Sequence, residues 1–107
     1  MALMLLNSLG GEKERFKPLQ PSGVSFYTCG PTVYAASHIG NLRTFVVSDF
    51  FRRTLERFSY TVRQVINITD VDDKTITGAK EANLSLPDFT ARYERIFFNV
   101  LNALNIL

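Results

Sequence analysis

The sequence predicts an α/β protein with a parallel βαβ core and flanking helices, and three patterns support this fold class. A short run of β-branched and aromatic residues at 24–28 leads into a Gly-Pro break. A helical pattern follows over residues 41–58, and residues 61–68 then alternate between two sets of side chains in the way typical of a strand. Because crossovers of this kind are almost always right-handed within one sheet, we expect the two strands to be parallel.

Residues 1–23 are expected to form a hairpin and a connection that precede this core. The pattern indicates a short strand at 3–6, a turn at 8–11 and a weak strand near 15–17. Proline and glycine residues then predict an irregular connection. We therefore divide the chain into an N-terminal hairpin unit, 1–23, and a main unit, 24–107.

The helix predicted at 41–58 has an apolar and a polar side on a helical wheel. Its apolar side comprises Val46, Val47, Phe50, Phe51, Leu55 and Phe58. Its polar side comprises Ser48, Asp49, Arg52, Arg53 and Glu56. We expect the apolar side to pack on the sheet.

Two further helices are predicted after the second strand. The pattern Thr69-x-x-Asp72 can cap a helix at about 71–82, and Ser85-x-x-Asp88, with Pro87 in the first turn, can start a third helix. The third helix carries an apolar stripe formed by Phe89, Tyr93, Ile96, Phe97, Val100, Leu101 and Leu104. Such a stripe is typical of core packing or of a partner surface, not of a catalytic site.

Composition limits the class of protein. The chain has 107 residues, enough for one domain at most, and its net charge of +2 is too small to indicate nucleic-acid binding by itself. A single cysteine excludes an internal disulfide and favours a reducing compartment. No apolar run approaches the roughly 20 residues of a membrane span, and the short apolar start lacks a basic region. We expect a cytoplasmic chain with no membrane partner.

The parallel arrangement brings two polar segments to one rim of the sheet. The first strand ends near Cys29 and the second near 67–69, and ligands of open α/β sheets bind at such carboxyl ends. Gly30 permits a sharp turn and a close approach to a ligand, and Gly40 at a helix start leaves room for a phosphate. His38 could donate a hydrogen bond to charge on that phosphate. The loop therefore suits a nucleoside triphosphate.

Simpler interpretations of the same residues stay open at this point. A lone cysteine at a strand end is most often a small buried apolar residue. His38 can be a helix cap or a surface residue, and Thr69, Asp70 and Asp72 can serve only to cap the next helix.

Three segments together resemble a known family. Cys29-Gly30-Pro31-Thr32-Val33-Tyr34, followed after three residues by His38-Ile39-Gly40-Asn41, resembles the first signature of class I aminoacyl-tRNA synthetases, in the form found in cysteinyl-tRNA synthetases. Residues 67–74, NITDVDDK, match that family's N-I-T-D-x-D-D-K segment, and residues 102–107 resemble its ALNI stretch. The resemblance is collinear over nearly the whole chain.

The resemblance implies both a fold and an activity. Residues 24–107 would form the N-terminal half of a Rossmann-like class I catalytic domain. The full-length enzyme would activate L-cysteine with ATP and Mg²⁺ to cysteinyl adenylate, and would then transfer the cysteinyl group to tRNA(Cys).

The resemblance also assigns roles to residues. His38 and Asn41 would be catalytic, Asn41 being a permitted variant of the family's His or Asn. The ATP-binding residues would be Gly30, Pro31, Thr32, His38, Ile39, Gly40 and Asn41. The cysteine-binding residues would be Cys29, Gly30 and Thr69. Cys29 would also bind one Zn²⁺, which can prefer a thiolate over the near-isosteric hydroxyl of serine.

The sequence departs from the family in what it lacks. A zinc site needs three or more protein ligands, and this chain offers one Cys and one His. The family's other zinc ligands, its KMSKS loop and its tRNA-binding domain would lie beyond residue 107. We therefore expect an N-terminal fragment, truncated or from a split gene, that is inactive alone and prone to self-association.

Two rival functions remain. One is the ligase that joins cysteine to an amino sugar in mycothiol synthesis, which shares the adenylate step. The other is a non-catalytic nucleotide-binding module. A dinucleotide-binding domain is disfavoured because the sequence has no G-x-G-x-x-G after the strand.

Overall fold

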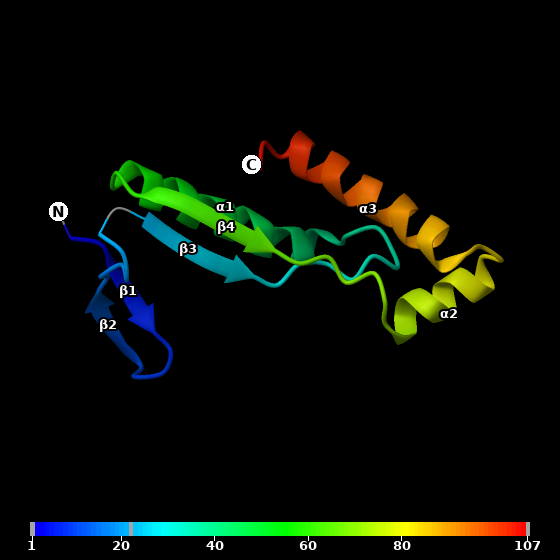
Figure 1. Ribbon diagram of the computed structural model, residues 1–107, viewed down its shortest axis with the longest axis horizontal. Helices are drawn as coiled ribbons and strands as arrows, with labels where there is room; N and C mark the ends of the chain where they lie inside the picture. The colour runs from blue at the N-terminus through cyan, green and yellow to red at the C-terminus, as the bar shows by residue number, and fades with distance from the viewer. Residues whose placement is uncertain (1, 22, 107) are drawn as a thin grey trace.

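A computed structural model describes residues 2–21 and 23–106 and contains the expected parallel βαβ unit. Strands β3 (Gly23–Thr28) and β4 (Thr61–Ile66) pair in parallel, with Gly23 opposite Thr61 and Thr28 opposite Ile66. Helix α1 (Ile39–Arg57) connects them and packs along β4 behind the strands (Figure 1). The prediction of parallel strands is therefore confirmed.

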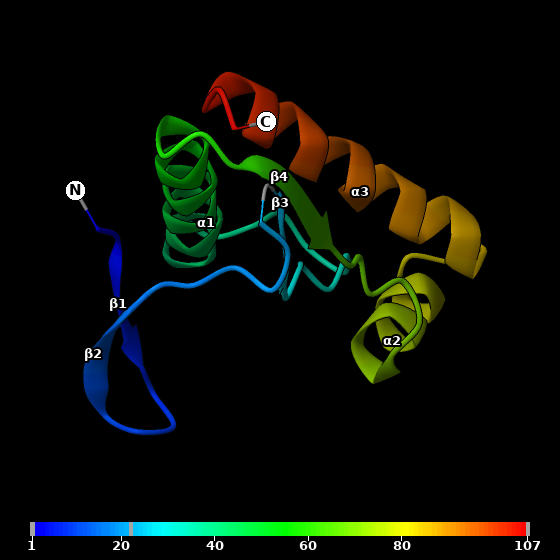
Figure 2. The ribbon, with the colours of Figure 1, turned by 60° about the vertical axis from the view of Figure 1, so that its left-hand side comes forward.

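The N-terminal hairpin is present, but its second strand starts earlier than the sequence pattern indicated. Strand β1 (Met4–Asn7) pairs antiparallel with β2 (Glu12–Arg15). The turn closes at Gly11, whose φ of 71° is left-handed and whose N–H donates to the Asn7 carbonyl at 2.7 Å. The hairpin projects from the βαβ unit (Figure 2). The division of the chain at residue 23 stays a prediction.

The predicted apolar face of α1 is wrong in part. Phe50 and Val47 on that face are 72% and 59% exposed, whereas Ser48 and Asp49 from the polar face are buried together with Leu55. The helix is thus rotated relative to the wheel-based expectation, and it leaves an apolar strip open to solvent.

Hydrogen bonding explains why α1 buries polar side chains. The Gln64 amide of β4 donates to the Ser48 hydroxyl at 2.7 Å, and the Asp49 carboxylate is ion-paired with Arg52 and Arg53. The buried side chains of Ser48 and Asp49 therefore both have partners, which removes most of the cost of their burial, whereas the Oε1 atom of Gln64 is buried without one. The ring of Phe45, on the same side, packs edge-on against Phe97 at 5.0 Å between centroids.

Helices α2 (Asp73–Glu81) and α3 (Leu86–Ala103) pack against each other beyond the end of the sheet (Figure 1). Asp72, not Thr69, caps α2: its carboxylate accepts from the Thr75 N–H, and the Thr75 hydroxyl accepts from the Asp72 N–H, both at 2.9 Å. The assignment of Thr69 as the cap is therefore wrong. Ser85 caps α3 as expected, accepting from the Asp88 N–H at 3.2 Å.

The stripe of α3 is buried at its first residue and near its centre, and exposed at its end. Phe89 and Phe97 are buried, whereas Leu104 lies in solvent. Gly78 makes the contact with α2 possible, because a Cβ on Gly78 would lie 2.5 Å from the Phe89 ring.

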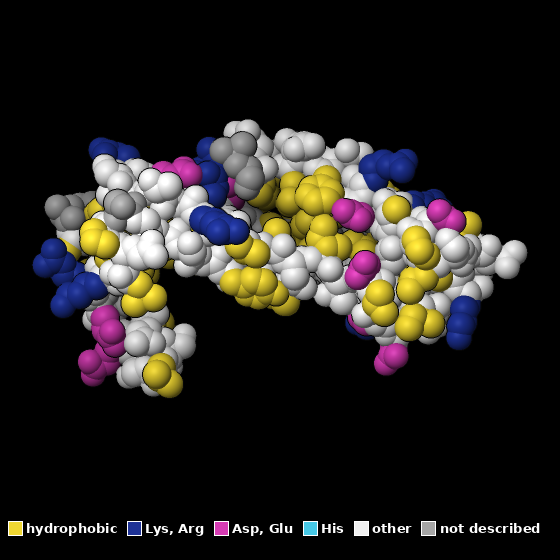
Figure 3. Space-filling model, viewed as in Figure 1, with side chains coloured by type: hydrophobic (Ala, Val, Ile, Leu, Met, Phe, Trp, Pro, Cys, Tyr) yellow, Lys and Arg dark blue, Asp and Glu magenta, His cyan; other side chains and the backbone are white. Residues whose placement is uncertain are grey.

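The described residues form an elongated body. Its extents are 55 × 29 × 24 Å and its radius of gyration is 17.1 Å, against about 13 Å for a compact domain of this length. Apolar side chains accordingly lie in patches on the surface (Figure 3). No helix within the described residues is long and apolar enough to cross a membrane.

The contact at Gly78 predicts a stability effect. Gly78→Ala should lower the free energy of unfolding by about 1–2 kcal/mol, because the new methyl overpacks the ring of Phe89 and outweighs the gain in helix propensity. Thr77→Ala, at an exposed position of the same helix, is the matched control and should be close to neutral. Urea unfolding followed by circular dichroism measures both, and equal stabilities of the two variants would contradict the packing role.

Candidate functional site

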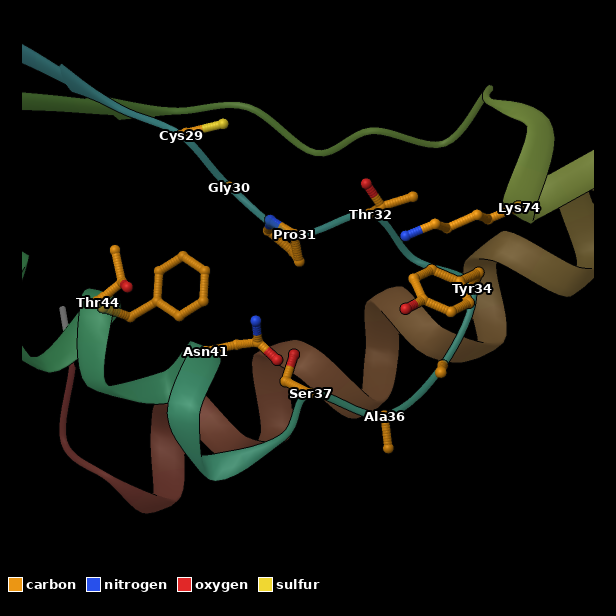
Figure 4. A pocket seen from close by; sticks show the side chains of 12 residues that line it. Cys29, Gly30, Pro31, Thr32, Tyr34, Ala36, Ser37, Asn41, Thr44 and Lys74 are labelled. Atoms are coloured by element: carbon orange, nitrogen blue, oxygen red, sulfur yellow. The ribbon is translucent and has the colours of Figure 1, made fainter.

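A pocket of about 410 Å³ lies between the loop after β3, the first turns of α1 and the start of α2 (Figure 4). Its walls are made by Cys29, Gly30, Pro31, Thr32, Tyr34, Ala35, Ala36, Ser37, Asn41, Thr44, Phe45 and Lys74. Half of these residues belong to the first sequence signature, and Ala35, Ala36 and Ser37 are the three residues between its two parts. The pocket therefore occupies the strand-to-helix rim that the sequence indicated.

The two strand ends are joined at this rim. The Thr69 N–H donates to the Pro31 carbonyl at 2.9 Å, and the Val33 N–H donates to the Thr69 carbonyl at 3.1 Å. These bonds extend the parallel pairing beyond β3 and β4 as a bridge between Thr32 and Thr69. The expectation that the two segments meet is confirmed.

The Asn67 side chain holds the same junction from within. Its amide oxygen accepts from the Gly30 N–H at 2.8 Å and from the Tyr27 hydroxyl at 2.7 Å. Its amide nitrogen donates to the Thr69 hydroxyl at 3.1 Å. One carboxamide thus connects the end of β3, the start of the loop and the segment after β4.

Gly30 is required by close packing of the chain on itself. A Cβ at this position would overlap the Asn67 carbonyl group, which is backbone and cannot rotate away. Among the described glycines, Gly11 alone has a positive φ, so the role of Gly30 is a close approach of backbone and not a left-handed conformation. It lines the pocket because its backbone runs directly between Asn67 and the cavity.

His38 caps α1. Its Nδ1 accepts from the Gly40 N–H at 3.1 Å, so in the neutral imidazole the proton lies on Nε2, which can still donate to a ligand. His38, Ile39 and Gly40 are exposed and do not line the pocket, whereas Asn41, in the first turn of the helix, does. Figure 4 shows the Asn41 amide beside the Ser37 hydroxyl, facing the loop.

Cys29 is exposed and lines the pocket, so the alternative of a buried apolar cysteine is wrong. The described residues contain no cluster of three or more His, Cys, Asp or Glu side chains that could hold a metal. By themselves they do not fit a complete zinc site, and Cys29 can supply one ligand. Thr69 is not among the residues that line the pocket; its hydroxyl is bonded to Asn67.

Sequence reasoning missed the far wall of the pocket, which includes Tyr34 and Lys74. The Lys74 ammonium lies over the Tyr34 ring, 5.0 Å from its centroid, in a cation–π contact. Lys74 ends the second matching segment, and that match was the available signal of a functional role.

Comparisons with known proteins place this chain among related sequences. The family described as the catalytic domain of class I (C) tRNA synthetases matches residues 15–107. Three similar proteins are each named cysteine–tRNA ligase: those of Methanosarcina mazei, 53% identical over 104 residues, Brachyspira hyodysenteriae, 49% identical over 104 residues, and Koribacter versatilis, 47% identical over 106 residues. The match covers 97% of this chain for the first two and 99% for the third. The chain spans only 21–22% of the length of these relatives.

The packing of Gly30 predicts a second stability effect. Gly30→Ala should cost about 3 kcal/mol or more, because its methyl would force the loop away from the Asn67 backbone and break the bonds at the junction. Gly40→Ala is the control, since its methyl would meet only the His38 ring at 3.3 Å. Chemical denaturation compares the two, and a Gly30→Ala protein as stable as Gly40→Ala would refute the role of Gly30.

Proposed function

Since the chain belongs to the family of class I (C) tRNA synthetase catalytic domains, we propose that it carries part of the active site of a cytoplasmic cysteine–tRNA ligase. In a protein of its relatives' length, this enzyme activates L-cysteine with ATP and transfers the cysteinyl group to tRNA(Cys). The observation that supports the proposal best is the single pocket lined by Cys29, by the loop after it and by Asn41 of α1. Both halves of the first family signature border that pocket or its rim.

The proposed first step forms cysteinyl adenylate. An oxygen of the cysteine carboxylate attacks the α-phosphorus of ATP, which is bound with Mg²⁺, and pyrophosphate leaves. Little acid–base chemistry is needed, so positioning and charge stabilisation supply most of the rate enhancement.

In this proposal His38 and Asn41 stabilise the phosphates. The bond from the Gly40 N–H to His38 Nδ1 fixes the orientation of the imidazole, and leaves Nε2–H to donate to a phosphate oxygen. The Asn41 amide donates from the pocket wall, and the positive end of the α1 dipole favours the same negative charge. Gly30, Pro31, Thr32, Ile39 and Gly40 complete the proposed ATP contacts.

We assign recognition of the cysteine substrate to Cys29, Gly30 and Thr69. The Cys29 thiolate would be one ligand of a Zn²⁺ ion, and the remaining ligands would come from outside the described residues. When bound, such an ion supplies selectivity for a thiolate over a hydroxyl, which a cavity of fixed shape cannot achieve well.

Activity can be tested in a chimera in which this chain replaces the matching 104 residues of the Methanosarcina mazei relative. We expect cysteine-dependent exchange of pyrophosphate into ATP, and charging of tRNA(Cys). His38→Asn should lower the exchange rate about 100-fold while preserving the helix cap, because asparagine is a good cap but does not reproduce the Nε2–H donor.

Two outcomes would contradict the proposal. A folded chimera that exchanges no pyrophosphate refutes the catalytic assignment. A His38→Asn chimera with full activity shows that His38 serves only as a helix cap.

The zinc assignment has its own measurement. The chimera should hold about one zinc by elemental analysis, and Cys29→Ser should lose it because a hydroxyl is a much poorer zinc ligand than a thiolate. Ser25→Ala, at an exposed position of β3, is the matched control and should retain the metal. Zinc retained in Cys29→Ser would remove Cys29 from the ligand set.

A further inference from the structure

Lys74 is the only charged side chain among the residues that line the pocket. The other lining residues are neutral, and no Asp or Glu among them compensates its charge. Within residues 2–21 and 23–106, the ion pairs join Asp49 and Glu56 to arginines and do not include Lys74. The ammonium group therefore gives the pocket a net positive charge.

Neighbouring groups fix the position of the Lys74 ammonium. The backbone N–H of Lys74 donates to the Asp72 carboxylate at 2.9 Å, which anchors the first turn of α2. Its Nζ lies over the Tyr34 ring, and Figure 4 shows the side chain reaching from α2 toward the loop. A cation held over an aromatic face keeps its N–H groups free to donate to a ligand.

The N-terminus of α2 contributes to the same site. Lys74 lies in the first turn of α2, where the macrodipole is positive and favours an anion, and where Asp72 and Asp73 already carry negative charge. The Thr32 and Ser37 hydroxyls and the Asn41 amide, which also line the pocket, are suitable additional donors.

We infer that Lys74 binds the triphosphate of ATP and that Tyr34 positions its ammonium group. This inference rests on the proposed function and adds to it a residue from the second matching segment. Charge-assisted hydrogen bonds to phosphate oxygens should make ATP bind at least about tenfold more tightly than adenosine, which lacks the charge.

The test is a titration of the 107-residue chain with ATP, adenosine, inorganic tripolyphosphate and L-cysteine, followed by NMR of backbone amides. Wild type should prefer ATP over adenosine and should bind tripolyphosphate. Lys74→Met should lose both properties, and Lys74→Arg should retain most of them. Lys80→Met, an exposed lysine of the same helix outside the pocket, is the matched control and should behave as wild type.

The outcomes separate this inference from the proposed function. If Lys74→Met leaves tight ATP binding unchanged, the role of Lys74 is overturned and the nucleotide site stands. The same follows if Lys80→Met weakens ATP binding as much as Lys74→Met does. If Lys74→Met changes the affinity for L-cysteine and not the affinity for ATP, Lys74 binds the carboxylate of the amino acid, and the triphosphate assignment is overturned. Absence of binding to both ATP and adenosine overturns the inference for this chain, and the chimera tests the proposed function separately.

Discussion

The Asn67 carboxamide is the interaction on which the rest of the site depends. It bonds to the Tyr27 hydroxyl, the Gly30 N–H and the Thr69 hydroxyl, at the point where two parallel strands stop pairing. Side-chain amides are well suited to this task because one group both accepts and donates. From this junction the loop after β3 follows the segment after β4 before it turns into α1. The walls of the pocket are therefore set by strand pairing, not by a separate structure of the loop.

The elements of the fold were predictable because local signals agree with the final packing. The alternation at Val62, Gln64 and Ile66 marks a strand with one side turned inward, and the Ser85 cap marks the start of α3. The orientation of α1 was not predictable from its own sequence. Its inward side is decided by Gln64 and by arginine partners, and a helical wheel contains neither.

The residues of the candidate site likewise fall into those that the sequence predicted and those that it did not. Residues adjacent in sequence, from Cys29 to Thr32 and again at Asn41, were found because their spacing is a recognisable signature and the βαβ geometry brings it to the rim. Lys74 was missed since it reaches the pocket from a different helix, and only tertiary structure puts it over Tyr34. Gly30 was predicted to allow close approach to a ligand, and the structure adds a contact that the sequence did not indicate, with a carbonyl about forty residues away.

The pairing of Gly23 with Thr61 also dictates when the structure can form during synthesis. Helix α1 closes local contacts and forms in about a microsecond, whereas β3 must wait for a partner about forty residues downstream. At translation rates of about 5–20 residues per second, β3 leaves the ribosome roughly 2–8 s before β4. Throughout that interval β3 is an unpaired strand with apolar side chains, which is the kind of surface that chaperones bind. The nascent chain exposes this surface before the pocket can form.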